Sequence, residues 1–363
     1  MTEQLKLKLN DSKATRWGAL VIVAFTMMAA YYVNDVVAPL KTMLETDLAW
    51  SSTDFGFFTG GYSFLNVFFL MLIWGGLILD RFGIRFTGKL ATILMVGGTA
   101  LEYYAMTGLA GADATLFGIN EIFGYKTGVF VAFAGYSIFG VGAEVAGITV
   151  SKIIAKWFKG KELATAMGVQ VALARIGSQA GYAVAIPLAR AFGISTPVLL
   201  GLVLLLGGMI AFFIFAVMDK KLDKQMEAAA IAAGTEDEEE KFSFKDVKNI
   251  LVNPGFWLIA LLCVLFYSCV FPFQKFASEL MIIKYGINEN VAGTFAGLPA
   301  LGALILTPVF GGFIDKRGKS ASIMLLGSAM LICVHFIYAI PDINYWLVAI
   351  VLMIILGIAF SLV

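Results

Sequence analysis

Two opposite charges lie inside apolar segments of this chain, and their spacing places them at similar depth. Glu144 precedes Lys152, the first lysine of its loop, by eight residues, and Arg175 lies eleven residues into the next apolar segment, which begins near residue 164. At the rise of an α-helix these separations are about 12 and 17 Å. An acid and a base at that depth, on neighbouring antiparallel helices, can bind the ammonium and carboxylate groups of a zwitterion. The alternative is an internal salt bridge that only joins the two helices.

Other polar side chains interrupt apolar segments and are candidates for the same binding site. Tyr62 and Asn66 lie one helical turn apart, so they either line a pore or hold two helices together. Asp35 lies in the outer part of the first apolar segment, where it either lines the cavity or caps the helix. Ser178 follows the arginine by three residues, and Tyr267 lies in the seventh apolar segment. We take all five as candidate substrate ligands.

Three further charges are expected to lie outside any site. Lys275 and Glu279 are four residues apart, so they are predicted to pair with each other at the outer end of their helix. Glu102 is predicted to be a similar charge at the outer end of the third apolar segment.

The sequence offers no arrangement of residues for metal or cofactor chemistry. His335 is the only histidine, which excludes an H-E-x-x-H zinc site. Gly140-Val-Gly142 is too short to match a dinucleotide fingerprint, and no strand precedes it. The cysteines lie in apolar stretches and are interpreted as small hydrophobic residues. The sequence therefore predicts neither an enzyme nor a cofactor or metal site.

The composition is that of a membrane protein. Of the 363 residues, 60% are hydrophobic and 14% are charged, and the mean hydropathy is +0.88. A soluble chain of this length could not bury so much apolar surface, so the chain is predicted to lie in a lipid bilayer. The net charge of +1, without a basic stripe, argues against a nucleic-acid partner.

Hydropathy and charge together predict the topology. Of the 26 lysines and arginines, 20 lie in the N-terminal tail, in alternate short loops and in the interval after residue 217, against four in the opposite loops. By the positive-inside rule the N-terminus is cytoplasmic, and we expect a bacterial inner membrane. Ten spans are expected: 17–40, 55–79, 86–107, 128–150, 164–189, 194–217, 255–280, 291–314, 321–340 and 343–363.

The interval after the sixth span divides the chain into two parts. It holds an alanine-rich, helix-prone run and then the acidic run 236–240, which is interpreted as a solvated segment. We therefore expect an N-terminal six-helix bundle (1–217), a cytoplasmic linker (218–253) and a C-terminal bundle (254–363). The last of these would hold helices seven to ten and lack two helices.

A short basic turn occurs once in each part, which indicates an internal duplication. Duplicated halves in a membrane protein point to a transporter with its site between them. Each turn places an aspartate, a glycine and basic residues between two apolar segments, where they either act as a conformational latch or only fix the topology. The latch residues are Gly76, Asp80, Arg81, Gly83 and Arg85 in the first turn and Asp315, Lys316, Gly318 and Lys319 in the second.

These turns resemble the loop signature of the major facilitator superfamily. The strings Trp157-Phe-Lys-Gly-Lys-Glu-Leu163 and Ala174-Arg-Ile-Gly-Ser178 are similar to the lysosomal dipeptide transporter branch of that superfamily, over roughly residues 25–363. The resemblance implies two pseudo-symmetric six-helix bundles, the second truncated here. It also implies that Glu144 and Arg175 bind the amino and carboxyl termini of a dipeptide.

The leading hypothesis is a secondary transporter that moves small zwitterions, dipeptides foremost, by alternating access. One alternative is an organic-anion antiporter or a proton-coupled symporter of the same fold, with the proton on Glu144. Another is a membrane sensor or scaffold that binds a ligand without moving it. The expected partners are a small-molecule substrate and the lipid bilayer, and an accessory membrane subunit is left open.

Overall fold

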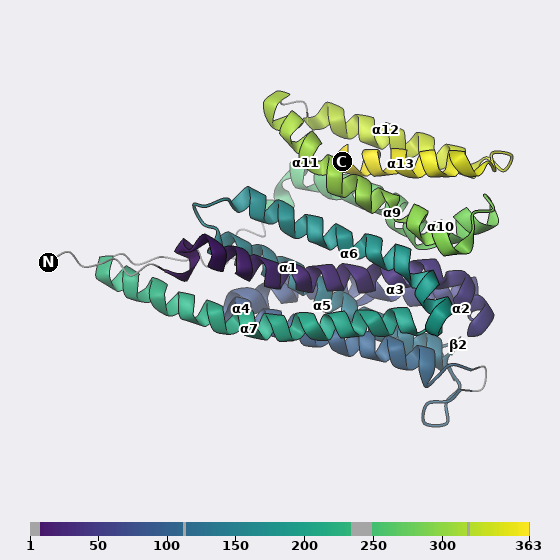
Figure 1. The fold of residues 1–363 in the computed structure, drawn as a ribbon, viewed down its shortest axis with the longest axis horizontal. Helices are drawn as coiled ribbons and strands as arrows, with labels where there is room; N and C mark the ends of the chain where they lie inside the picture. The colour runs from purple at the N-terminus through teal and green to yellow at the C-terminus, as the bar shows by residue number, and fades with distance from the viewer. Residues whose placement is uncertain (1–7, 112–113, 234–248, 318–319, 363) are drawn as a thin grey trace.

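The computed structural model describes residues 8–111, 114–233, 249–317 and 320–362. Most of these residues are helical, and the long helices run side by side along the longest axis of the molecule (Figure 1). The sheet found in these ranges is a single antiparallel hairpin of β1 (Glu121–Ile122) and β2 (Tyr125–Lys126). The all-α architecture predicted from the sequence is confirmed.

We call the helices before residue 234 the first bundle and those after residue 253 the second bundle. The second bundle lies along one side of the first (Figure 1). The first comprises η1 (Leu9–Asp11), α1 (Lys13–Val36), η2 (Ala38–Leu40), α2 (Lys41–Asp47), α3 (Ser52–Phe68), α4 (Met71–Thr107), α5 (Thr127–Trp157), α6 (Leu163–Phe192) and α7 (Thr196–Ala233). The second comprises α9 (Pro254–Ile283), α10 (Glu289–Ala296), α11 (Leu298–Arg317), α12 (Ser320–Ala339) and α13 (Trp346–Leu362).

The two ends of the molecule differ in the elements they carry. One end, the hairpin end, holds α2, the β1–β2 hairpin and α10 (Figure 1). The other, the basic end, holds η1, the turn after Asp80 and the loop between α5 and α6. Both ends are defined by these elements alone.

Each of the ten apolar segments predicted from the sequence is largely helical, but the breaks fall differently. α3 and α4 meet at a bend of 58°, and α4 runs through the expected gap between the second and third spans. Its interruption there is a single residue, Gly83, whose φ of 74° is open to glycine at no steric cost. In the part of the chain that the structure describes, six helices are long and apolar enough to span a membrane, or seven if α3 and α4 count as one span.

α7 runs further than the sixth predicted span. It ends at Ala233 and not near residue 217, because the alanine-rich run after the span continues the helix. The backbone N–H of Leu9 donates to Gln225 Oε1 at 2.8 Å, so this extension packs on the N-terminal segment. The acidic run 236–240 lies outside the described residues.

Glycines bring the helices of the first bundle into backbone contact. A Cβ added to Gly140 of α5 would lie 2.3 Å from the carbonyl oxygen of Tyr62 in α3. A Cβ added to Gly177 of α6 would lie 2.1 Å from the carbonyl oxygen of Met28 in α1. Small residues at helix crossings are how membrane helices approach closely. Here they fix α3 on α5 and α1 on α6, the pairs that carry the predicted site.

Candidate functional site

Glu144 and Tyr62 form one side of the candidate site. The Tyr62 hydroxyl of α3 donates a hydrogen bond of 2.8 Å to Glu144 Oε1 of α5. Both side chains are half-buried. The contact depends on Gly140, one turn before Glu144, because a larger residue there would push α3 away. The structure therefore brings two of the predicted ligands together and leaves the second carboxylate oxygen for a cation.

Arg175 is the basic candidate ligand, and its neighbours are aromatic. Its guanidinium carbon lies 5.8 Å from the ring of Tyr31 in α1 and 5.0 Å from the ring of Phe360 in α13. Phe360 belongs to the second bundle, so Arg175 lies between the bundles. Aromatic faces stabilise a cation without neutralising it. Arg175 thus keeps its charge and its planar set of donors for an anionic group.

Glu144 and Arg175 do not form a salt bridge with each other. Within the described part of the chain, no carboxylate oxygen lies within 4.0 Å of the Arg175 nitrogens. The ring of Tyr31, which lies against the Arg175 guanidinium, is an aromatic neighbour of the candidate site. Neither the composition nor the spacing singled it out as a ligand.

The other predicted ligands take different positions. Asn66 donates to the carbonyl oxygen of Tyr62 at 3.2 Å, and its own Oδ1 is buried without a partner among the described residues. The hydroxyl of Ser178 is likewise buried and unpartnered there. Tyr267 is 44% exposed and stacks on Phe271 at a centroid distance of 5.0 Å. A buried polar atom without a partner costs free energy, so Asn66 and Ser178 are suited to accept a ligand's hydrogen bonds.

Asp35 is bound across the two bundles. Its Oδ1 lies 3.5 Å from Lys275 Nζ of α9 and accepts a hydrogen bond of 2.9 Å from Asn34. Lys275 also donates to Tyr136 Oη at 3.1 Å and to the carbonyl oxygen of Asn34. The predicted pair of Lys275 with Glu279 is wrong, because the face of α9 that carries both residues packs on α1 and α2. A substrate role for Asp35 stays a prediction.

Glu279 is instead an ion-pair partner of Lys41 in α2, a lysine whose side chain is only 2% exposed. The third ion pair that joins the bundles is Arg190 with Glu289, and Arg190 also donates to Asn290 Oδ1 at 2.7 Å. Tyr182 donates to the carbonyl oxygen of Gln274 at 3.1 Å. All these contacts lie in the half of the molecule that ends in the hairpin. Among the described residues, the structure is closed at its hairpin end.

The model of the Major Facilitator Superfamily matches residues 19–363. The chain belongs to this superfamily. The family expected from the basic turns and the two specific strings is therefore confirmed, and with it an integral, multi-pass membrane protein.

Similar proteins within the superfamily are named as a dipeptide transporter. Human "Lysosomal dipeptide transporter MFSD1" is 27% identical in an alignment 363 positions long, which covers 96% of this chain and 71% of that protein. The Gallus gallus protein of the same name is 31% identical over 241 residues, 63% of this chain and 51% of that protein.

Solved structures of the superfamily share the fold. The xylose transporter XylE from E. coli, in a partially occluded inward open conformation, matches with a TM-score of 0.65 at 16% identity, over 96% of this chain and 84% of that chain. Tetrameric PepTSo2 matches with a TM-score of 0.64 at 12% identity, over 96% and 82%. At these identities the likeness shows the fold alone.

The first basic turn of this superfamily member divides its contacts between two networks. Asp80 pairs with Lys152 of α5 at 3.0 Å, and both side chains are about half exposed. Arg85 does not turn back to Asp80. It pairs with Asp219 of α7 at 3.1 Å and with Asp223, and the fully buried Asp219 also accepts from the Trp157 indole N–H at 3.0 Å.

The remaining latch residues give less information. Gly76 has open space around its Cα, and the guanidinium carbon of Arg81 lies 5.5 Å from the ring of Phe82. In the second turn, Gly318 and Lys319 lie outside the described residues, as do the side chains of Asp315 and Lys316. The latch role of both turns stays a prediction.

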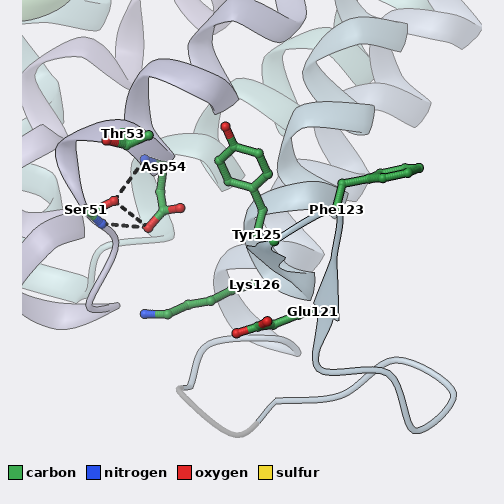
Figure 2. Close-up of a pocket in the computed structure, with 8 residues that line it drawn as sticks. Ser51, Thr53, Asp54, Glu121, Phe123, Tyr125 and Lys126 are labelled. Carbon is green, nitrogen blue, oxygen red and sulfur yellow. Dashed lines mark hydrogen bonds between the residues drawn. The ribbon is translucent and has the colours of Figure 1, made fainter.

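A cavity of about 490 Å³ at the hairpin end is separate from this site (Figure 2). Three of its polar side chains have partners: Ser51 and Asp54 cap the start of α3 through mutual hydrogen bonds of 2.8 to 3.1 Å, and Lys126 donates to the carbonyl oxygen of Ala49. Lys126 immediately precedes α5 and lies 18 residues before Glu144, which is about 27 Å at the helical rise. The cavity is therefore far from the predicted ligand Glu144.

Glu102 differs from its prediction. It is fully buried in α4 and not a charge at the outer surface, and both carboxylate oxygens are buried without a hydrogen-bond partner among the described residues. The burial follows from Gly98, one turn earlier, and Gly135 of α5, which let the two helices touch: a Cβ on Gly135 would lie 3.0 Å from the Glu102 nitrogen. The glycine one turn before the acid is the sequence signal that could have revealed it.

Proposed function

We propose that this chain is a secondary transporter that moves small zwitterions, dipeptides foremost, by alternating access. The observation that supports the proposal is the pair of Glu144 and Arg175. Glu144 accepts a hydrogen bond from Tyr62, and Arg175 lies against the rings of Tyr31 and Phe360 without a carboxylate partner among the described residues. Membership of the superfamily supports transport, and the name of the relatives supports dipeptides.

The separation of the two charges favours a ligand over a structural bridge. Their atoms lie more than 4.0 Å apart, and an extended dipeptide spans about 7 Å at most. In the proposed complex, Glu144 and Tyr62 bind the ammonium group, and the planar guanidinium of Arg175 binds the carboxylate through two parallel hydrogen bonds. Asn66 and Ser178 bind the polar groups between the two ends.

The closed hairpin end supports one half of an alternating-access cycle. If the positive-inside rule holds, the basic end is cytoplasmic and the described state is closed toward the outside. The N-terminal bundle (1–217), the linker (218–253) and the C-terminal bundle (254–363) predicted from the sequence are then the moving parts. Asp35 and Lys275 separate when the outer side opens.

Counterflow into liposomes tests the substrate class. Vesicles that contain the purified protein and are loaded with an unlabelled dipeptide are expected to accumulate the same dipeptide in labelled form. Free amino acids and dicarboxylates, each tested in the same way, are the controls. Accumulation of a dicarboxylate with none of a dipeptide would favour the organic-anion alternative. Ligand binding without any counterflow would favour a sensor.

A further inference from the structure

The buried group that the proposed substrate site does not use is Glu102. It is fully buried in α4, where the backbone of α5 approaches it at Gly135. Neither carboxylate oxygen has a hydrogen-bond partner in the described part of the chain. An ionised carboxylate in such a place loses its hydration and gains nothing in return, which costs several kcal/mol. A neutral carboxylic acid does not carry that cost.

The ionisable groups nearest to Glu102 come from three helices. Lys275 of α9 and Tyr136 of α5 are close enough for their charges to interact with its carboxyl group, and Asp35 of α1 pairs with Lys275. The remaining neighbour, α7, carries no titratable residue between Thr196 and Val217. The cluster therefore contains one cation and two carboxyl groups.

Lys275 has no donor left for Glu102. An ammonium group has three N–H donors. Those of Lys275 are directed to Asp35, to the carbonyl oxygen of Asn34 and to the hydroxyl of Tyr136, at 3.5 and 3.1 Å for the first and last. Charge balance then requires the second carboxyl group, Glu102, to be neutral while the hairpin end is closed.

We infer that Glu102 is a proton-binding site and that closure of the hairpin end takes up one proton there. When the bundles part, Lys275 leaves the first bundle and water reaches Glu102, which then ionises as a hydrated glutamate. On closure the carboxylate and a proton from that side combine to the neutral acid. Each closing event thus binds one proton from the compartment that the hairpin end faces.

The inference requires the two bundles to separate but not that the substrate is a dipeptide. A protein that moves no dipeptide can still open at its hairpin end in a pH-dependent way, and a dipeptide transporter can open there independently of pH. The two proposals therefore fail separately.

Cysteine labelling of the closed interface tests the inference. Ala38, which is 1% exposed and belongs to the same buried cluster as Ala277 of α9, is replaced by cysteine in a variant whose three native cysteines are serine. The protein is placed in lipid nanodiscs and labelled with a maleimide between pH 5.5 and 8. Each rate is divided by that of Thr46→Cys, an exposed position near the same end, because thiol reactivity itself rises with pH.

The normalised rate is expected to rise with pH by up to about tenfold per unit, because one proton must dissociate for each opening. Glu102→Gln is neutral at every pH, so its rate should stay low and flat. Glu227→Gln, an exposed site on the α7 extension, should behave as the parent. A flat rate in the parent, or an unchanged pH response in Glu102→Gln, would overturn the inference.

A second substitution covers the case that Glu102→Gln does not fold. Glu102→Asp keeps the acid and shortens the side chain by one methylene, which moves the carboxyl group relative to Lys275. A displaced midpoint of the pH response supports the site, and a midpoint identical to that of the parent overturns it.

Discussion

Glu144 and Arg175 present different chemistry to a ligand. Glu144 already accepts one hydrogen bond from Tyr62, so its orientation is fixed before a ligand arrives. Arg175 is oriented by the rings of Tyr31 and Phe360. A guanidinium held by ring faces keeps its edge donors for a carboxylate, which suits two-pronged binding.

Replacing either residue should weaken dipeptide binding. A hydrogen bond to a charged group contributes about 1.5–3 kcal/mol, so Glu144→Gln and Arg175→Lys should each lower dipeptide affinity by roughly 10- to 100-fold. The lysine keeps the charge but loses the planar geometry. The increase of melting temperature with a dipeptide measures the loss, because a ligand stabilises only a protein that binds it. Glu227→Gln is the control.

A salt bridge between the two residues would give another result. Both single variants would then melt at lower temperature without ligand, and the exchange Glu144→Arg with Arg175→Glu would restore stability. That outcome would contradict the binding role.

Helix contacts set the position of these residues. The backbone of α3 touches α5 at Gly140, one turn from Glu144, and the backbone of α1 touches α6 at Gly177, two residues after Arg175. The site is therefore built by helix crossings on which a single methyl group would not fit.

Gly140→Ala should destabilise the protein and the site together. The added Cβ would lie 2.3 Å from the backbone oxygen of Tyr62, which forces the helices apart at a cost of about 1–3 kcal/mol. We expect a lower melting temperature and weaker dipeptide binding. Gly147→Ala in the same helix is the matched control, because its nearest neighbour is a Met27 methyl group at 3.9 Å. Equal effects of the two changes would show that the crossing is not decisive.

The first basic turn, which contains Asp80, should affect the transport rate more than the affinity for a dipeptide. The pair of Asp80 and Lys152 is exposed, with side chains 51% and 44% accessible, so its loss should change stability by only about 0–1 kcal/mol. We expect Asp80→Asn to slow counterflow several-fold and to leave dipeptide affinity within about twofold of the parent. An equal loss of both would make Asp80 part of the site, and no loss would leave it a topology signal.

For the whole molecule, closure at the hairpin end depends on a few cross-bundle pairs. Lys41→Met leaves Glu279 without its cation, and breaking a buried pair from one side costs about 3–5 kcal/mol. Labelling of Ala38→Cys should then rise strongly at every pH. Lys126→Met, at the hairpin but on the first bundle only, should leave it unchanged. A result in which both lysine changes act alike would argue against a specific closing contact.

Hydropathy was sufficient to predict the helical segments, because the length of an apolar stretch is a local property of the sequence. The positions of Glu144, Tyr62 and Arg175 followed from helical rise and from the family resemblance. What the sequence concealed was contact between distant segments. Lys275 and Glu279 are one turn apart, yet each binds a residue more than 230 positions away. Glu102 was misplaced for the same reason: local spacing gives depth along a helix, not the neighbour that covers it.

The three ion pairs that close the hairpin end differ in their exposure to solvent and therefore to dissolved salt. Lys41 is 2% exposed and Lys275 is 14% exposed, whereas Arg190 and Glu289 are 43% and 41% exposed. At an ionic strength of 0.15 M exposed charges are screened over about 8 Å, while buried pairs are screened much less. Salt in the compartment that the hairpin end faces would therefore weaken one of the three contacts and leave the other two. The opening equilibrium of this protein should accordingly change little with the salinity of that compartment.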